Sequence, residues 1–307
     1  MTAEIIDCKQ IANAIKAELA KEVAKLSGDG LVPRLAIILV GDDAPSATYV
    51  RGKERDGAEV GILMDVYRLG DSEASHRLAG EGDPNQLTLE IRDLIDRLNG
   101  DYLVHGIILQ LPVPDGVDEG MLLASIDPRK DVDGLHPENQ GRILQGDPRY
   151  LPATPHAVQQ ILVRTKNDPG GKHVVIVGRS RLVGLPLANM LVQKRAGGNA
   201  TVTICHTSTP DLPGYVRAGD IVIAAAGQPG LITADMVRPG AVVIDVGINR
   251  VDDATRERGY RLVGDVDHAG VGEVAGAMTP VPGGVGLMTR VMLLTNVVRA
   301  ARESQRR

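Results

Sequence analysis

Four short aliphatic runs that end in glycine limit the possible folds of this chain more than any other feature. They are RLAIILVG at 34–41, VVIVG at 174–178, DIVIAAAG at 220–227 and AVVIDVG at 241–247. Short apolar runs bounded by glycine are typical of buried strands. Helical patterns alternate with them, such as IANAIKAELAKEVAKL at 11–26. This alternation predicts an α/β fold with a mostly parallel, doubly wound sheet.

The length of the chain and one proline-rich stretch predict two domains. The 307 residues are enough for two domains, and GDPRYLPATP at 146–155 has the composition of a domain junction. We expect an N-terminal α/β domain over 1–150, completed by a C-terminal helix over 285–307 that packs back on it. A second α/β domain is expected over 151–284. Because the chain lacks Phe and Trp, both cores must be aliphatic.

Composition excludes several classes of function. The net charge is −5 with both signs mixed along the chain, so no nucleic-acid surface is expected. The N-terminus has no hydrophobic signal core, and no apolar run approaches the roughly 18 residues of a membrane span. Cys8 and Cys205 favour a reducing cytoplasm over a disulfide framework. The seven histidines lack metal-ligand spacing, so no metal is predicted.

The segment VVIVGRSRLVGLP has the features of a nucleotide-binding turn. Gly178 would make the tight turn, and Gly184 would allow close approach of the helix that follows. The free N–H groups at that helix start would face a phosphate. The spacing departs from GxGxxG, because Ser180 and Val183 stand where the later glycines would be. An ordinary strand–turn–helix connection is the alternative interpretation.

The residues that follow the next strand favour NADP over NAD. A site for NAD has an acid at the end of the second strand, but ATVTICH ends in His206 and is followed by Thr207. Arg179 lies in the nucleotide-binding turn instead. The lack of an acid together with a nearby arginine favours binding of the 2′-phosphate of NADP. The alternative is that Arg179 faces solvent and NAD is accepted equally.

Polar side chains in the first half suggest a substrate site. A helix is expected from Ser46 to about Gly61. Tyr49 and Lys53 of SATYVRGKERDG, four residues apart, would lie on one face of it, although a solvated helix face would look the same.

Gln110 lies in VHGIILQLPVP, which is expected to be a strand halted by Pro112 and Pro114, and would be costly to bury unpaired. The segment DPRKDVDGLHPENQGR is expected to be a loop, in which Asp131 and Asp133 either face a substrate or form a turn.

Eight blocks in order resemble the bifunctional methylenetetrahydrofolate dehydrogenase/methenyltetrahydrofolate cyclohydrolase family. They are YVRGK, GIILQLPVP, KDVDGLHPENQGR, VGRSRLVGLP, ATVTICH, VIDVGINR, GDVDH and TPVPGGVGLMT. The resemblance implies a Rossmann-type second domain, an active-site cleft between the domains and a homodimer. It implies oxidation of 5,10-methylenetetrahydrofolate with NADP⁺, followed by hydrolysis of the methenyl product to 10-formyltetrahydrofolate.

The resemblance also implies roles for individual residues. Lys53 would be the catalytic lysine, Gln110 would contact and tune it, and Tyr49 would position the folate. Asp133 would hold the pterin end. Further positions implied are Pro282 and Gly283 for folate, and Gly178, Arg179, Ser180, Thr207 and Ile248 for the dinucleotide. A free lysine has a pKa near about 10.4, so desolvation must lower it for Lys53 to act as a base.

The chain departs from the family pattern at four positions: Ala153, His156, Leu287 and His268. None of them replaces Lys53, so an active enzyme is still expected. Two other functions remain open. One is a different two-domain NADP-dependent dehydrogenase, acting for example on a small hydroxy acid. The other is a non-enzymatic protein that senses a nucleotide.

Overall fold

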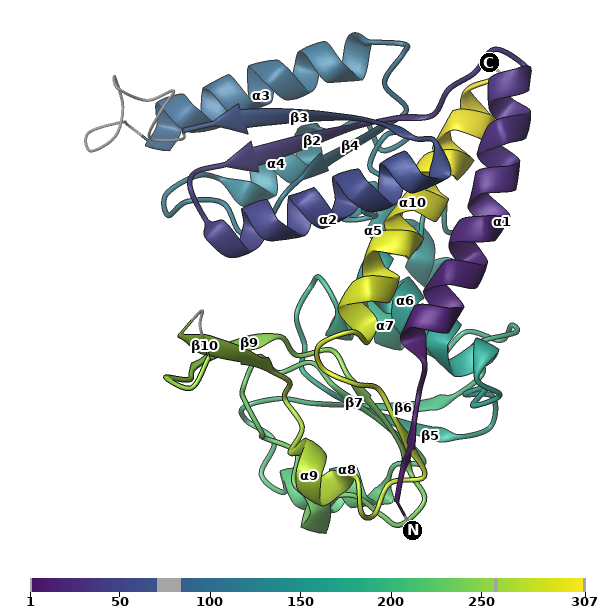
Figure 1. The fold of residues 1–307 in the computed structure, drawn as a ribbon, viewed down its shortest axis with the longest axis vertical. Helices are drawn as coiled ribbons and strands as arrows, with labels where there is room; N and C mark the ends of the chain where they lie inside the picture. Colours follow the sequence, from purple (N-terminus) through teal and green to yellow (C-terminus); the bar gives the residue numbers. More distant parts are fainter. Residues whose placement is uncertain (1, 71–83, 257–258, 306–307) are drawn as a thin grey trace. The chain divides into compact units, whose positions relative to one another are not determined.

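The chain forms two compact α/β units, which confirms the predicted two-domain class (Figure 1). The computed structural model describes residues 2–70, 84–256 and 259–305. One unit contains Met1–Ala14 and Pro152–Met292, and the other contains Ile15–Leu151 and Leu293–Arg307. Two of the three divisions fall inside long helices, α1 (Cys8–Gly28) and α10 (Val285–Ser304), and the third lies between Leu151 and Pro152.

The unit built on residues 15–151 has a parallel three-stranded sheet. Its strands, in spatial order, are β3 (Leu63–Leu69), β2 (Arg34–Val40) and β4 (Gly106–Leu109). Side chains of β2 alternate between the two faces, and Ala36, Ile38 and Val40 pack against α3 (Pro84–Gly100) and α4 (Glu119–Ser125). Figure 1 shows α2 (Ala44–Val60) on the opposite side of these strands. The aliphatic run at 34–41 therefore forms a buried strand, as predicted, and it is the central strand of this sheet.

Helix α2 begins directly after the central strand and is closed at both ends by its own sequence. The side chain of Asp43 accepts a hydrogen bond of 2.8 Å from the N–H of Ser46, which satisfies one free donor of the first turn. Gly61 ends the helix in the left-handed conformation, with φ of 87°. This confirms the helix expected from about Ser46 to Gly61, and it places Tyr49 and Lys53 near the carboxyl end of β2.

Two sequence expectations in this unit needed correction. The third strand is shorter than VHGIILQLPVP suggested, although the N–H of Gln110 still donates to the carbonyl of Ile38 at 2.8 Å. Part of the segment taken as a loop, DPRKDVDGLHPENQGR, is helix α5 (Pro137–Leu144). Its start is explained by a proline in the first turn and by His136, whose Nδ1 accepts the N–H of Glu138.

The unit built on residues 152–292 has a parallel six-stranded sheet. Its strands, in spatial order, are β1 (Glu4–Ile5), β11 (Ala277–Met278), β8 (Val242–Asp245), β7 (Ile221–Ala224), β5 (His173–Val177) and β6 (Thr201–Cys205). Three of the aliphatic runs form β5, β7 and β8, and the strand expected in ATVTICH forms β6, so these predictions are confirmed. The two-residue strands β1 and β11 and the antiparallel pair β9 (Asn249–Asp252) and β10 (Tyr260–Val263) were not predicted.

The helical segments of this unit are α6 (Ala153–Arg164), α7 (Gly184–Leu191), α8 (Leu212–Ala218), the 3₁₀ turn η1 (Ala234–Met236) and α9 (His268–Val271). Its core is aliphatic, as the lack of Phe and Trp requires, with Val175, Val222 and Val243 packed near Val216 of α8. After β5 the chain adds β6 on one side and then crosses to β7 on the other. Ligands of such sheets bind at the carboxyl ends of the strands beside this switch point.

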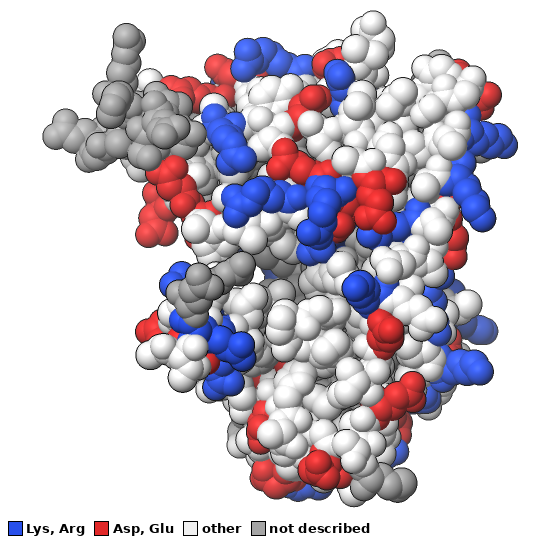
Figure 2. Space-filling model, in the orientation of Figure 1, with Lys and Arg blue, Asp and Glu red and all other residues white. Residues whose placement is uncertain are grey.

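Surface charge and helix hydropathy agree with the composition. In Figure 2 lysine and arginine side chains are interspersed with acidic ones. Among the helices that the structure describes, none combines the length and the apolar character needed to cross a membrane.

The C-terminal half of α10 is fixed by one buried amide, which gives a test of the fold. Asn296 is 3% exposed, and its Nδ2 donates to the carbonyls of Val132 at 2.8 Å and Leu151 at 2.9 Å. Asn296→Ala should lower the stability by about 1–3 kcal/mol, because two buried carbonyls lose their donor. Denaturant unfolding followed by circular dichroism measures this, with exposed Asn13→Ala as control. Equal midpoints for the two variants would contradict the assignment.

Candidate active site

Lys53 is the centre of a buried polar cluster. It is 5% exposed on α2, and its Nζ donates a hydrogen bond of 2.9 Å to Oε1 of Gln110. The same Nζ lies 5.0 Å from the ring centroid of Tyr49, one helical turn earlier. This distance is within the range of a cation–π contact. The structure therefore brings together three of the residues singled out in the sequence.

Gln110 is itself held in one orientation. Its Nε2 donates to the carbonyl of Leu111 at 2.7 Å, so Oε1 is the end that faces Lys53. This amide oxygen accepts a hydrogen bond from the amine of Lys53, and it carries no negative charge that would favour the ammonium form. The ammonium and the neutral amine of Lys53 can therefore both occupy this position, which a proton-transfer group requires.

Asp133 is electrostatically coupled to Lys53. Burial raises the pKa of the Asp133 carboxyl above its ordinary value, and the nearby ammonium of Lys53 opposes this by lowering it. A carboxylate in such surroundings gains from any donor that a ligand offers, because charge-assisted hydrogen bonds are stronger in a partly dehydrated site. Asp133 is thus suited to bind an N–H group of a substrate.

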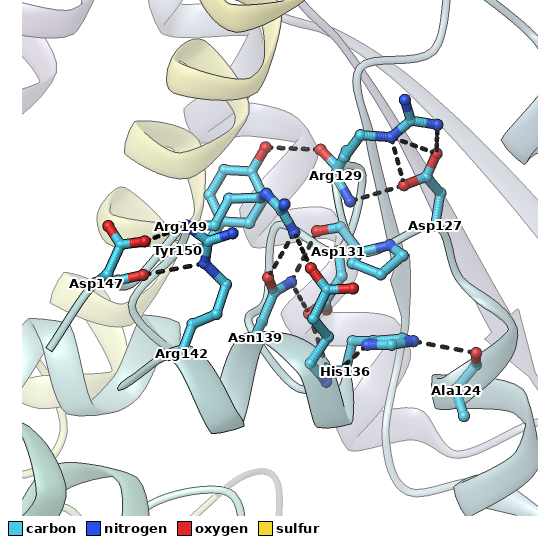
Figure 3. Close-up of polar contacts among 12 residues, drawn as sticks. Ala124, Asp127, Arg129, Asp131, His136, Asn139, Arg142, Asp147, Arg149 and Tyr150 are labelled. Atoms are coloured by element: carbon cyan, nitrogen blue, oxygen red, sulfur yellow. Dashed lines mark hydrogen bonds and ion pairs between the residues drawn. The ribbon is translucent and has the colours of Figure 1, made fainter. Parts of the chain in front are cut away.

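Asp131, two residues earlier, has a different role. It is 1% exposed and accepts hydrogen bonds from the N–H groups of Leu135 at 3.1 Å and His136 at 2.8 Å. Nδ2 of Asn139 is a third donor at 2.8 Å. Figure 3 shows Asp131 enclosed by this network. The sequence left both aspartates open as site or turn residues, and the structure shows that Asp131 forms the turn that carries Asp133.

Further contacts hold the segment that leads into this turn. Arg129 contacts both carboxylate oxygens of Asp127, and its carbonyl accepts the hydroxyl of Tyr150 at 2.6 Å (Figure 3). Lys130 donates to the carbonyl of Leu98 at 2.8 Å, at the end of α3. The position of Asp133 is therefore set by the hydrogen bonds around Asp131 and by the contact of Lys130 with the end of α3.

The nucleotide-binding turn is built on two close backbone contacts. Gly178 has φ of 131°, and a Cβ there would lie 2.1 Å from the carbonyl oxygen of Ala225. A Cβ at Gly184 would lie 2.1 Å from the carbonyl oxygen of Gly178. Only glycine fits at either place. Ser180 stands where the common pattern has glycine, and its Oγ accepts the N–H of Val183 at 3.1 Å. The turn is thus closely packed without GxGxxG spacing, and a helix begins directly after it at Gly184.

The other expected cofactor residues lie along the same edge of the sheet. Arg179 and Ser180 are exposed after β5, and Thr207 is exposed after β6. The last residues of these two strands, Val177 and Cys205, are partners in the sheet, so both strands end at the same edge. The segment 206–210 has no carboxylate. Ile248 is exposed after β8.

Pro282 and Gly283 are exposed in the loop between β11 and α10 of this unit.

In the part of the chain that the structure describes, no group of three or more His, Cys, Asp or Glu side chains could hold a metal.

Both halves of the chain match family models. Residues 6–133 match the catalytic domain of tetrahydrofolate dehydrogenase/cyclohydrolase, and residues 152–305 match its NAD(P)-binding domain. The chain belongs to the tetrahydrofolate dehydrogenase/cyclohydrolase family. The bifunctional protein FolD of Salinibacter ruber is 50% identical over 98% of this chain and 96% of its own length.

Solved structures of the family have the same fold. FolD of Campylobacter jejuni has a TM-score of 0.87 at 41% identity, with 98% of this chain and 99% of that chain covered. FolD of Trypanosoma brucei, complexed with NADP and an inhibitor, has a TM-score of 0.90 at 38% identity, with both chains fully covered. The fold class and the presence of an NAD(P)-binding domain predicted from the sequence are thereby confirmed.

The four departures from the family pattern lie in helices. Ala153 is buried at the start of α6, His156 lies one turn later, and Leu287 is half-buried in the first turn of α10. Nothing in the structure explains these three. His268 begins α9, and its Nε2 lies 3.0 Å from Oδ2 of Asp245. Asp245 and Asp265 were not predicted as functional residues, although a carboxylate inside the apolar run AVVIDVG was a signal for Asp245.

The role of Asp131 gives a test within this network. Asp131→Ala leaves three donors without their acceptor, so we expect a loss of about 2–4 kcal/mol in the free energy of unfolding. Asp147→Ala removes an exposed ion pair with Arg142 and should cost no more than about 1 kcal/mol. Denaturant midpoints of the two variants make the comparison. If Asp131→Ala unfolds no earlier than Asp147→Ala, Asp131 does not hold the turn.

Proposed function

We propose that this chain oxidises 5,10-methylenetetrahydrofolate to 5,10-methenyltetrahydrofolate with NADP⁺ and hydrolyses that product to 10-formyltetrahydrofolate. The observation that carries the proposal is the buried Lys53, held by a neutral amide beside Tyr49 and coupled to Asp133. Membership of the family supports it, because the chain has both the catalytic and the NAD(P)-binding domain.

The hydrolytic step needs a group that moves protons. Addition of water to the cationic methenyl carbon releases one proton. Rupture of the bond to N5 then places a proton on N5 and removes one from the new hydroxyl, so the overall reaction releases one proton. The neutral amine of Lys53 would take the first proton and, as the ammonium, give it to N5; the amine so regenerated would take the hydroxyl proton and pass it to water. Oε1 of Gln110 accepts a hydrogen bond from the ammonium and so stabilises it between these events.

The same cluster would position the folate. The half-buried ring of Tyr49 offers a flat surface to an aromatic ligand, and the Asp133 carboxylate would accept the N–H groups of the pterin. Pro282 and Gly283 would line the folate site from the loop that precedes α10. In this proposal the folate-binding domain comprises residues 1–150 with 285–307.

The oxidation step depends on NADP⁺, which accepts a hydride from the one-carbon bridge. The chain's part is to orient the dinucleotide. Gly178, Arg179, Ser180, Thr207 and Ile248 would contact it, within an NADP-binding domain over 151–284. The absence of a carboxylate after β6 and the exposed Arg179 favour a 2′-phosphate over the bare hydroxyl of NAD.

Two further assignments belong to the proposal. The protein would act in the cytoplasm, since both cysteines are buried and unpaired as thiols. It would form a homodimer, as its resemblance to the family implies. Light scattering of the purified protein tests the dimer.

One experiment tests the proposed function against its alternatives. The protein is incubated with methylenetetrahydrofolate and either NADP⁺ or NAD⁺, while NADPH or NADH and the 10-formyl product are followed together. The proposal predicts that both products form, faster with NADP⁺. Binding of NADP⁺ without turnover would indicate a nucleotide sensor. Oxidation of a small hydroxy acid but not of the folate would indicate a different dehydrogenase.

Arg179 should determine the preference for NADP⁺. Its planar guanidinium can bind a phosphate through two hydrogen bonds, worth about 1.5–3 kcal/mol. Arg179→Ala should therefore reduce the ratio of kcat/KM for NADP⁺ to that for NAD⁺ by about 10- to 150-fold. Arg181→Ala is the matched control, because Arg181 is an exposed arginine of the same turn. An unchanged ratio in Arg179→Ala, or an equal change in Arg181→Ala, would refute the assignment.

Asp133 should act on folate and not on the dinucleotide. Asp133→Ala removes a charged acceptor for the pterin, so we expect folate affinity to fall by about 10- to 150-fold while NADP⁺ affinity is unchanged. Calorimetric titration with each ligand gives both values. Exposed Asp115→Ala serves as the control for loss of one negative charge. Equal losses for both ligands would show that Asp133 supports only the structure.

A further inference from the structure

Two buried acids in the NAD(P)-binding domain have no part in the function proposed above. Asp245 ends β8 in the block VIDVG and is 1% exposed, and Asp265 in the block GDVDH is fully buried. A buried carboxylate is costly unless several donors surround it. Their donors therefore indicate what these two acids hold in place.

The two acids and two glycines interlock reciprocally. Oδ1 of Asp245 accepts the N–H groups of Gly247 and Asp265, both at 3.0 Å. A Cβ at Gly264 would lie 1.8 Å from Oδ2 of Asp245, and a Cβ at Gly247 would lie 2.3 Å from Oδ1 of Asp265. Each carboxylate thus packs against the glycine near the other acid. This arrangement explains why the blocks read Asp-Val-Gly and Gly-Asp-Val.

Asp265 also reaches two segments outside this interlock. Its Oδ2 accepts the N–H groups of Ala226 at 2.6 Å and Gly227 at 2.8 Å, just after β7. Its Oδ1 accepts Nδ2 of Asn249 at 2.8 Å, one residue after Ile248. A single carboxylate therefore joins the segments that follow β7 and β8.

These segments lie where a dinucleotide on this sheet must extend. The carbonyl of Ala225 is the group that excludes a side chain at Gly178, so 225–227 adjoin the phosphate-binding turn. The residues proposed to contact the 2′-phosphate end of the dinucleotide, Arg179 and Thr207, follow β5 and β6. The switch point lies between β5 and β7, so the other half of the dinucleotide must extend toward β7 and β8.

We propose that Asp265 is a positioning residue for the nicotinamide half of the dinucleotide. It fixes the backbone at 226–227 and the side chain of Asn249, and through them the surface on which the nicotinamide rests. The inference relies on the proposed binding of NADP⁺, but not on the chemistry of the folate. Charge-assisted bonds from three donors give this surface one conformation before the ligand arrives.

The test is Asp265→Ala, read by calorimetric titration with NADP⁺ and by two activities. We expect the dissociation constant for NADP⁺ to rise about tenfold or more. Hydrolysis of supplied methenyltetrahydrofolate without any nicotinamide should stay within about twofold of the wild type, because Lys53 and its partners belong to the other compact unit. Glu273→Gln, which removes an exposed carboxylate charge from the same unit, should change neither value.

Two results would overturn the proposal. One is wild-type affinity of Asp265→Ala for NADP⁺, and the other is a loss of hydrolysis as large as the loss of NADP⁺ affinity, which would show a general structural role. If Asp265→Ala does not fold, Asp265→Asn decides, since it keeps one acceptor and should weaken NADP⁺ binding about two- to fivefold with hydrolysis retained. Wild-type affinity in that variant would also refute the proposal. Because titration needs no turnover, these results are separate from whether the wild type oxidises the folate.

Discussion

The hydrogen bond between Lys53 and Gln110 is the interaction on which the candidate active site depends. Burying an amine is costly unless a partner meets it, and here the partner is a neutral amide fixed by its own bond to Leu111. The sheet makes this contact possible. Strands β2 and β4 are parallel neighbours, so the start of α2 after β2 and Gln110 after β4 lie at the same edge. A shift in the register of these strands would separate the amine from the amide.

In the second unit, buried polar groups are satisfied where backbone segments pack closely together. Gly178 lies against Ala225, and the carboxylates of Asp245 and Asp265 lie against Gly264 and Gly247. Glycines here leave room for a carbonyl or a carboxylate, and the buried acids satisfy N–H groups that a loop would otherwise expose to water. The edge of this sheet is therefore closely packed and internally hydrogen-bonded at the places proposed to bind a dinucleotide.

Local patterns explain why much of the fold was predictable. The aliphatic runs identified β2, β5, β7 and β8, and ATVTICH identified β6. The periodicity at 11–26 identified α1, since strand and helix periods are visible within one segment. The two-residue strands β1 and β11 have no period to detect, and they pair residues 4–5 with residues 277–278, far apart in the sequence. Helix α5 was missed because its proline and glycine resembled a loop.

The sites were less predictable, because their contacts are distant in sequence. Lys53 and Gln110 are 57 residues apart, and their contact was expected from family resemblance and not from spacing. The sequence KDVDG does not distinguish the roles of Asp131 and Asp133. The structure does, because Asp131 accepts hydrogen bonds within its own turn whereas the charge of Asp133 interacts with that of Lys53. Asp265 gave no signal, since its donors come from segments after two other strands.

The central claim is that Lys53 moves the proton in the hydrolysis of methenyltetrahydrofolate. The most direct measurement is the rate of that hydrolysis by Lys53→Met, in which methionine keeps the long apolar stem and a similar helix propensity. The exposed Lys21→Met is the control. We expect a loss of about 10²–10⁴-fold for Lys53→Met, with NADP⁺ affinity and the unfolding midpoint unchanged. Hydrolysis at the wild-type rate would contradict the account.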